Sequence, residues 1–186
     1  MGELLFRQLR EGLALQRYLK TGGYNLNFAF NIQAEQLLST TLASHVQKLL
    51  KDYVVSGCGL TFELAESGLL RLNEASLVCL YRLRMMGCGL SLDSFGTGCS
   101  TLLRLCQLPF SEIKLDAQFV RSAINEPQWR TAISSTLVLG EALGIPVVVE
   151  GVETQEQQLL LGLGCRHGQG HWYASAMSAE ALIQWF

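Results

Sequence analysis

The chain has 186 residues, of which 49% are apolar and 16% charged, with a formal net charge of −2. This length suits one well-buried domain, and the small net charge excludes a broad, sequence-independent grip on nucleic acid. No apolar run reaches the roughly 18 to 20 residues of a membrane span, and the amphipathic start MGELLFRQLREGL is no secretory signal, so we expect a cytoplasmic protein.

Six short apolar segments are predicted to be β-strands, each followed by a segment of helical character. They are residues 26–32, 60–66, 90–95, 112–116, 146–152 and 169–174. Strands that alternate with helices at intervals of roughly thirty residues predict a parallel sheet with helical crossovers. The sequence therefore indicates an α/β fold.

Several residues mark where the helices begin and end. Apolar side chains recur at helical spacing between Leu37 and Leu50. The expected N-caps are Asn73, Thr154 and Ser178, and Gln157 completes a capping box with Thr154. Gly164 is expected to end the helix that starts at Thr154.

Two segments of the chain resemble each other. GCGLTFELAES at 57–67 and GCGLSLDSFGT at 87–97 both open with Gly-Cys-Gly, continue as an apolar strand and carry an acid three or four residues into that strand. Such repetition favours a TIM-like (β/α) barrel over an open sheet. No G-x-G-x-x-G turn follows any strand, which argues against a dinucleotide-binding fold.

The cysteines and histidines indicate no metal centre of their own. None of the six cysteines lies in a C-x-x-C pair, so we expect small buried side chains that stay reduced. His167 and His171 have the spacing of a helical zinc motif, but the Gly-Gln-Gly between them excludes a helix there.

Polar residues gather at or near the carboxyl ends of the predicted strands. They are Asn31, Glu63, Glu66, Asp93, Lys114, Asp116, Glu150, Glu153 and Gln169. In a barrel these ends meet on one rim, where crowded carboxylates need a cation among them. Oxygen donors of this kind suit Mg²⁺ or Mn²⁺. Two structural alternatives stay open: Lys114 and Asp116 form an ion pair, and Glu66 only caps a loop.

The ordered motifs FNIQAEQL, FELAES, LDSFGTGCSTL, IKLDAQFV, VVVEGVET and GCRHGQG resemble the EAL domain, a family of phosphodiesterases of the bacterial second messenger cyclic di-GMP. The resemblance runs from about residue 24 to residue 177. It implies a (β/α)₈ barrel with one reversed strand, and a two-metal site that opens cyclic di-GMP to linear pGpG.

The resemblance also implies a role for individual residues. Asn31 and Glu63 match ligands of the first metal, Asp93 matches the ligand that bridges both metals, and Glu150 matches a ligand of the second. Lys114 matches the lysine that contacts the nucleophilic water. Catalytic support is expected from Glu153 and substrate contact from Gln169, while Glu66 would anchor the dimerisation loop that contains Phe95 and Gly96.

The sequence departs from the family pattern in four places. Ser94 stands where the family has a second aspartate that ligates the second metal. The Glu-Ala-Leu signature is missing from its place, since AEAL at 179–182 falls in the final helix. Ala65 and Ala176 replace a usual threonine and proline. We therefore expect a single domain over residues 1–186, with six of the eight strands and without the N-terminal signature strand.

Three functional hypotheses follow. The first is an impaired EAL-like module that binds cyclic di-GMP or a protein and associates as a homo-oligomer or with a partner or upstream domain. The alternative is an active, metal-dependent phosphodiesterase, as part of a longer multidomain protein or through tolerance of Ser94. The third is a fragment without independent function.

Overall fold

A computed structural model of the chain describes residues 2–39, 41–98, 102–155, 157, 162 and 164–186. Within these residues, six strands form one sheet in the order β1-β2-β3-β4-β5-β6, and each strand pairs in parallel with the next. They are β1 (Phe28–Ile32), β2 (Leu60–Ala65), β3 (Gly89–Phe95), β4 (Glu112–Leu115), β5 (Val147–Val149) and β6 (His167–Gly168). The predicted parallel sheet is confirmed.

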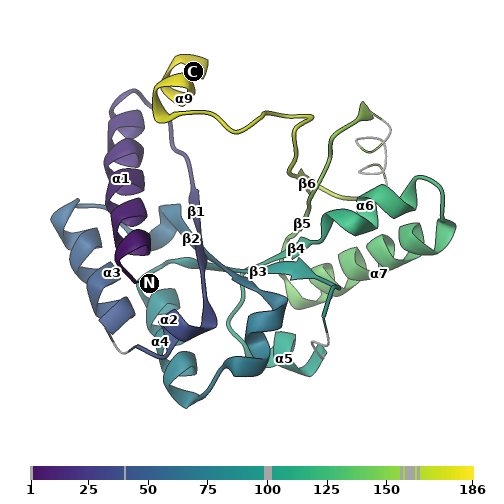
Figure 1. Ribbon diagram of the computed structural model, residues 1–186, viewed down its shortest axis with the longest axis horizontal. Coiled ribbons are helices and arrows are strands. Elements are labelled where there is room, and N and C mark those ends of the chain that lie inside the picture. The colour runs from purple at the N-terminus through teal and green to yellow at the C-terminus, as the bar shows by residue number, and fades with distance from the viewer. Residues whose placement is uncertain (1, 40, 99–101, 156, 158–161, 163) are drawn as a thin grey trace.

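The helices lie around the outside of this curved sheet, except for α9, which lies at the top of the view (Figure 1). The α-helices are α1 (Gly2–Thr21), α2 (Ala34–Leu37), α3 (Thr41–Asp52), α4 (Glu74–Met85), α5 (Leu102–Gln107), α6 (Ala117–Ala123), α7 (Pro127–Leu143) and α9 (Ala179–Trp185). Two 3₁₀ turns, η1 (Gly57–Gly59) and η2 (Glu66–Arg71), flank β2. No described helix combines the length and the apolar character needed to cross a membrane.

The two faces of the central strands differ in character because side chains alternate along a strand. One face is apolar and buried against the helices; it includes Phe62, Leu64, Leu90, Leu92, Ile113 and Leu115. The other face carries Glu63, Ser91 and Lys114, which are also buried. Burial on both faces explains why these strands are so apolar in sequence. The apolar face holds the core, and the polar face positions the site.

The predicted helix caps are confirmed. The Asn73 side chain accepts a hydrogen bond from the Ser76 amide at 3.0 Å, and the Ser178 hydroxyl accepts one from the Ala181 amide at 3.2 Å. Thr154 and Gln157 form the expected reciprocal pair, at 3.3 and 3.0 Å. Most of the helix expected from there to Gly164 lies outside the described residues.

The prediction of the last strand, 169–174, was wrong. The strand is His167–Gly168, and the chain then turns at Gly170. The amide of Trp172 donates to the carbonyl of Val152 at 3.0 Å, which folds this segment back onto the residues after β5. β5 is likewise shorter than predicted, because the backbone turns at Gly151, where φ is +72°.

Two further predictions need correction. The helical pattern between Leu37 and Leu50 forms two helices, since α2 ends at Leu37 and α3 begins at Thr41. Among the cysteines, Cys79 and Cys88 are buried as expected, but Cys58 and Cys106 are exposed. Cys99 lies outside the described residues.

Candidate functional site

A buried lysine links two carboxylates on the polar face of the sheet. Lys114 comes from β4, Glu63 from β2 and Glu150 from the residue after β5. The Lys114 Nζ lies 3.0 Å from Glu63 Oε1 and 2.7 Å from Glu150 Oε1. Lys114 is 4% exposed and Glu63 8%, so these contacts are shielded from water. One ammonium group therefore partly neutralises two acids.

Burial and charge act against each other in this group. Burial works to lower the pKa of Lys114, but its hydrogen bonds and ion pairs with Glu150 and Glu63 outweigh it and raise that pKa. Burial raises the pKa of Glu150, and the negative charges of Asp93 and Glu63 add to the rise, against the opposing effect of Lys114. Glu63, Asp93 and Glu150 thus share one electrostatic environment, with Lys114 as its cation.

The strand that carries Asp93 is distorted beside the site. Leu92 pairs with Ile113 and Phe95 with Leu115, so three residue steps along β3 match two along β4. This irregularity is a β-bulge, and bulges re-aim side chains next to functional sites. Ser94 occupies the bulge with φ +56°, a left-handed conformation that aspartate adopts more readily than most residues. The backbone at this position would therefore accommodate an aspartate, but the residue is serine.

The loop after β3 is held by Glu66. This side chain is 2% exposed, and its Oε2 accepts hydrogen bonds from the amides of Gly96 and Gly98, each at 2.9 Å. Gly96 has φ +94°, and a side-chain carbon there would lie 2.4 Å from the Phe119 ring. Phe95 is half-buried against the core. Glu66 therefore fixes the loop that contains Phe95 and Gly96 by charge-assisted hydrogen bonds.

Three predicted site residues, which lie on β1 or after β5 and β6, are exposed. Asn31 on β1 is in register with Glu63, so both side chains lie on the same face, but Asn31 is exposed. Gln169 is also exposed, and its backbone pairs with Val149 and Val152. The carboxylate of Glu153 lies 4.0 Å from the His171 ring, and both side chains are more than half exposed.

The sequence alternatives for Lys114 and Asp116 are resolved by their contacts. Lys114 pairs with Glu63 and Glu150, whereas Asp116 caps α6 by accepting a hydrogen bond from the Gln118 amide at 2.8 Å. Lys114 and Asp116 therefore do not form an ion pair with each other. Asp116 belongs to the helix rather than to the group around Lys114.

Ser91 is a residue that sequence reasoning missed. It lies in register with Glu63, two residues before Asp93, and it is fully buried. Its hydroxyl is the buried side-chain polar atom in the described residues that has no hydrogen-bond partner. The period of two along a strand was the signal that placed Ser91 on the same face as Asp93.

Comparison with known protein families matches residues 1–176 to the EAL domain. The chain belongs to the EAL domain family. Cyclic di-GMP phosphodiesterase RocR of Pseudomonas aeruginosa is 42% identical over 184 residues, which cover 98% of this chain and 47% of RocR. The chain thus spans about half the length of this relative.

Solved EAL structures share the fold. The phosphodiesterase MucR of P. aeruginosa in complex with c-di-GMP has a TM-score of 0.90 and 36% identity, covering 97% of this chain and 74% of that one. Klebsiella pneumoniae BlrP1, in a manganese and c-di-GMP complex, has a TM-score of 0.79 and 28% identity, covering 89% and 43%. The TIM-like barrel fold of the EAL domain is therefore confirmed, with six of its strands described here.

The predicted ligands of this EAL domain carry donor atoms that suit a divalent cation, but the described residues do not form a ready-made metal site. Asn31, Glu63 and Asp93 offer the amide and carboxylate oxygens that Mg²⁺ and Mn²⁺ prefer. Within the described residues, however, no three His, Cys, Asp or Glu side chains are grouped so that they could hold a metal ion. Glu63 and Glu150 instead share the Lys114 ammonium. A cation at Glu150 must compete with that ammonium group.

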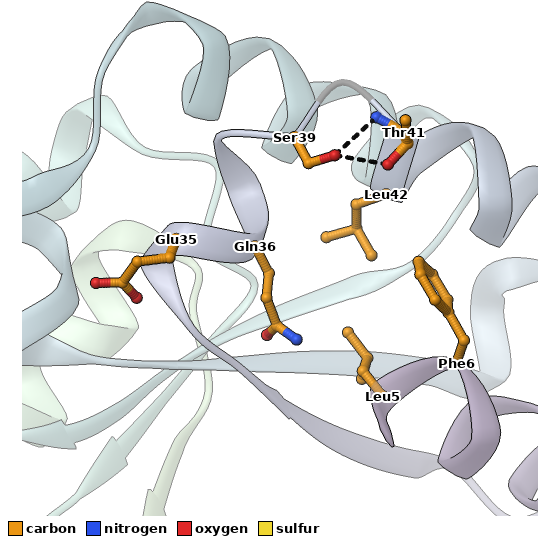
Figure 2. A pocket seen from close by; sticks show the side chains of 7 residues that line it. All are labelled: Leu5, Phe6, Glu35, Gln36, Ser39, Thr41 and Leu42. Carbon is orange, nitrogen blue, oxygen red and sulfur yellow. Dashed lines mark hydrogen bonds between the residues drawn. The ribbon is translucent and has the colours of Figure 1, made fainter. Parts of the chain in front are cut away.

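A separate pocket lies between α1, α2 and the start of α3 (Figure 2). Its volume is about 260 Å³. Leu5, Phe6 and Leu42 form its apolar wall, while Glu35, Gln36, Ser39 and Thr41 line its polar side. Lys114 and its two carboxylate partners are not among the residues that line this pocket. It is therefore distinct from the candidate site.

Proposed function

We propose that this EAL domain binds cyclic di-GMP but hydrolyses it far more slowly than a domain with an aspartate at position 94. The observation that carries the proposal is Ser94 in the bulge of β3, beside Asp93. A neutral hydroxyl is a poorer ligand for a hard dication than a carboxylate. The domain would therefore signal through binding rather than through turnover.

The donors divide unequally between the two cation positions that the family resemblance implies. Asn31, Glu63 and Asp93 would hold the first cation, while Glu150 and Asp93 would hold the second without help from Ser94. Such cations, when bound, lower the pKa of a water and stabilise charge on the attacked phosphate. Losing even an indirect support of a metal ligand costs about 10- to 100-fold in affinity or activity, so loss of a direct ligand at Ser94 should cost at least that.

Lys114 supplies positive charge close to the position where the second cation would bind weakly. Its ammonium lies between Glu63 and Glu150 at 3.0 and 2.7 Å, and these contacts favour the charged form of the lysine. This charge lowers the repulsion that the carboxylates would exert on a phosphate diester. The relatives support the choice of ligand, because solved EAL structures contain c-di-GMP.

Product analysis tests the proposal. The chain is incubated with cyclic di-GMP and Mn²⁺, and the mixture is separated by chromatography for pGpG, with calorimetry under the same conditions to measure nucleotide binding. We expect a calorimetric binding signal with little pGpG, and at least tenfold more pGpG from Ser94→Asp. Rapid production of pGpG by the native chain contradicts the proposal.

The second candidate is an active metal-dependent phosphodiesterase. The observation in its favour is the presence of Asp93, Lys114 and Glu150 in one electrostatic group, in a chain 42% identical to the phosphodiesterase RocR. Under this reading Ser94 is tolerated, and Ser94→Asp changes the rate of pGpG formation little. The same chromatographic assay therefore separates the two candidates.

We also propose that the chain associates with itself or with a protein partner. β1 and β6 are the outer strands of the sheet, and in the described residues each pairs with one neighbouring strand only. Exposed strand edges favour pairing with another chain. Light scattering checks this: we expect a mass above that of one chain, and a monodisperse monomer contradicts the expectation.

A further inference from the structure

The two Gly-Cys-Gly turns that the sequence repeats lie against each other. Cys58 is in η1, just before β2, and Cys88 directly precedes β3, which pairs with β2. A side-chain carbon built on Gly87 would lie 3.1 Å from the sulfur of Cys58, and one built on Gly57 would lie 2.9 Å from the sulfur of Cys88. Each sulfur thus packs against the glycine that precedes the other cysteine.

The two thiols differ in exposure. Cys58 is exposed, whereas Cys88 is 0% exposed. Burial raises the pKa of the Cys88 thiol to about 11, and the neighbouring Cys58 adds to the rise, against the opposing charge of Arg84. Cys88 is therefore protonated and shielded at neutral pH, while Cys58 is open to a reagent from solvent. A reagent from solvent therefore reaches Cys58 first, and Cys88 lies in the turn packed against it.

We propose that Cys58 and Cys88 form an oxidisable dithiol that reacts with low-molecular-weight disulfides such as oxidised glutathione. The Cys58 thiolate attacks one sulfur of glutathione disulfide, and one glutathione thiolate leaves. Cys88 then loses its proton and attacks the Cys58 sulfur, and the second glutathione leaves. The protein loses two protons and two electrons, and one glutathione disulfide becomes two glutathione thiols.

The bond would connect the starts of the two strands that carry Glu63 and Asp93. These two residues lie in the paired part of β2 and β3, where Glu63 is opposite Ser91 and Asp93 is opposite Ala65. A covalent link between the starts of these strands restricts their separation in the unfolded chain and so stabilises the fold. This inference does not depend on the proposed activity.

Mass spectrometry of the full chain tests the proposal. The reduced protein is incubated with oxidised glutathione, its remaining thiols are alkylated, and it is digested with trypsin. Cleavage after Lys51, Arg71, Arg84 and Arg104 places Cys58 in peptide 52–71 and Cys88 in peptide 85–104. We expect the intact chain to lose the mass of two hydrogen atoms and the two peptides to be linked.

Three variants and one fragmentation experiment assign the bond. Cys58→Ser removes an exposed thiol and should abolish the link, whereas Cys106→Ser removes the other exposed thiol of the described residues and should leave the link intact. Cys99 shares peptide 85–104 with Cys88, so fragmentation of the linked peptides must place the bond at Cys88. Because Cys88 is buried, fragmentation gives this answer even where Cys88→Ala fails to fold.

Thermal unfolding gives a second result. The oxidised native chain should melt at a higher temperature than the reduced chain, and dithiothreitol should reverse the increase. Oxidised glutathione should leave the melting temperature of Cys58→Ser unchanged. A stable glutathione adduct on Cys58, a bond to Cys99 or Cys106, or no linked peptide would overturn the proposal.

Discussion

The central strands of the sheet and its two outer strands contribute different kinds of site residue. In the centre, the side chains of Glu63 and Lys114 are less than a tenth exposed. The Lys114 ammonium lies 3.0 Å from the Glu63 carboxylate and 2.7 Å from that of Glu150. On the outer strand β1, Asn31 is exposed, and Gln169 is exposed just after β6. Residues that were predicted to serve one site therefore lie in very different surroundings.

This difference separates effects on stability from effects on binding. A charge buried in the centre has lost its water and depends on its partners, so removing one partner destabilises the fold. An exposed amide at the edge keeps its water, and its removal costs the fold little. Substitutions in the centre should therefore change folding and binding together, whereas those at the edge should change binding alone.

The largest effect is expected at Lys114. Lys114→Met leaves Glu63 and Glu150 buried without their cation. Breaking a buried ion pair by removing one partner costs about 3–5 kcal/mol, which urea unfolding measures. Lys48→Met is the matched control, because Lys48 is exposed, and it should change the free energy of unfolding by no more than about 0.5 kcal/mol. Equal stability of both variants contradicts a structural role for the Lys114 ion pairs.

A smaller effect is expected at Glu66. Glu66→Ala removes the acceptor of the Gly96 and Gly98 amides and should lower the free energy of unfolding by about 3 kcal/mol. Hydrogen exchange should become faster at these two amides. The exposed Glu141 offers a control, since Glu141→Ala should leave the exchange of both amides unchanged. Unaltered protection of the glycines in Glu66→Ala would mean that other contacts hold the loop.

The smallest effect on stability is expected at the edge. Asn31→Ala should change the free energy of unfolding by no more than about 0.5 kcal/mol, because Asn31 is exposed on an outer strand. If its amide is a cation ligand, the same variant should weaken Mn²⁺ binding in a calorimetric titration. A loss of several kcal/mol in stability would remove the distinction between centre and edge.

The same distinction explains how much of the fold could be predicted from the sequence. Central strands such as 60–65 and 89–95 must bury one apolar face in the core, so their hydrophobic pattern is clear in the sequence. The bounds of these strands were therefore predicted to within one residue. The last strand was misplaced because its end depends on contacts between Trp172 and Val152, which are twenty residues apart. Local pattern contains no information about such a contact.

The candidate site shows the same limit. The strand ends predicted which residues gather, and Glu63, Lys114 and Glu150 do meet on one face. Their pairing could not be predicted, because Asp116 is nearer to Lys114 in sequence than either partner but leaves the strand to cap α6. The bulge at Ser94 could not be predicted from the sequence either, because it arises from the mismatch in register between β3 and β4.

The central claim is that Ser94 weakens one cation position beside Asp93, and calorimetric titration of Mn²⁺ tests it most directly. The native chain and Ser94→Asp are titrated side by side in the presence of cyclic di-GMP. We predict that Ser94→Asp binds a cation at least tenfold more tightly than the native chain does. Two tightly bound cations in the native chain, with an isotherm that Ser94→Asp leaves unchanged, would contradict the account.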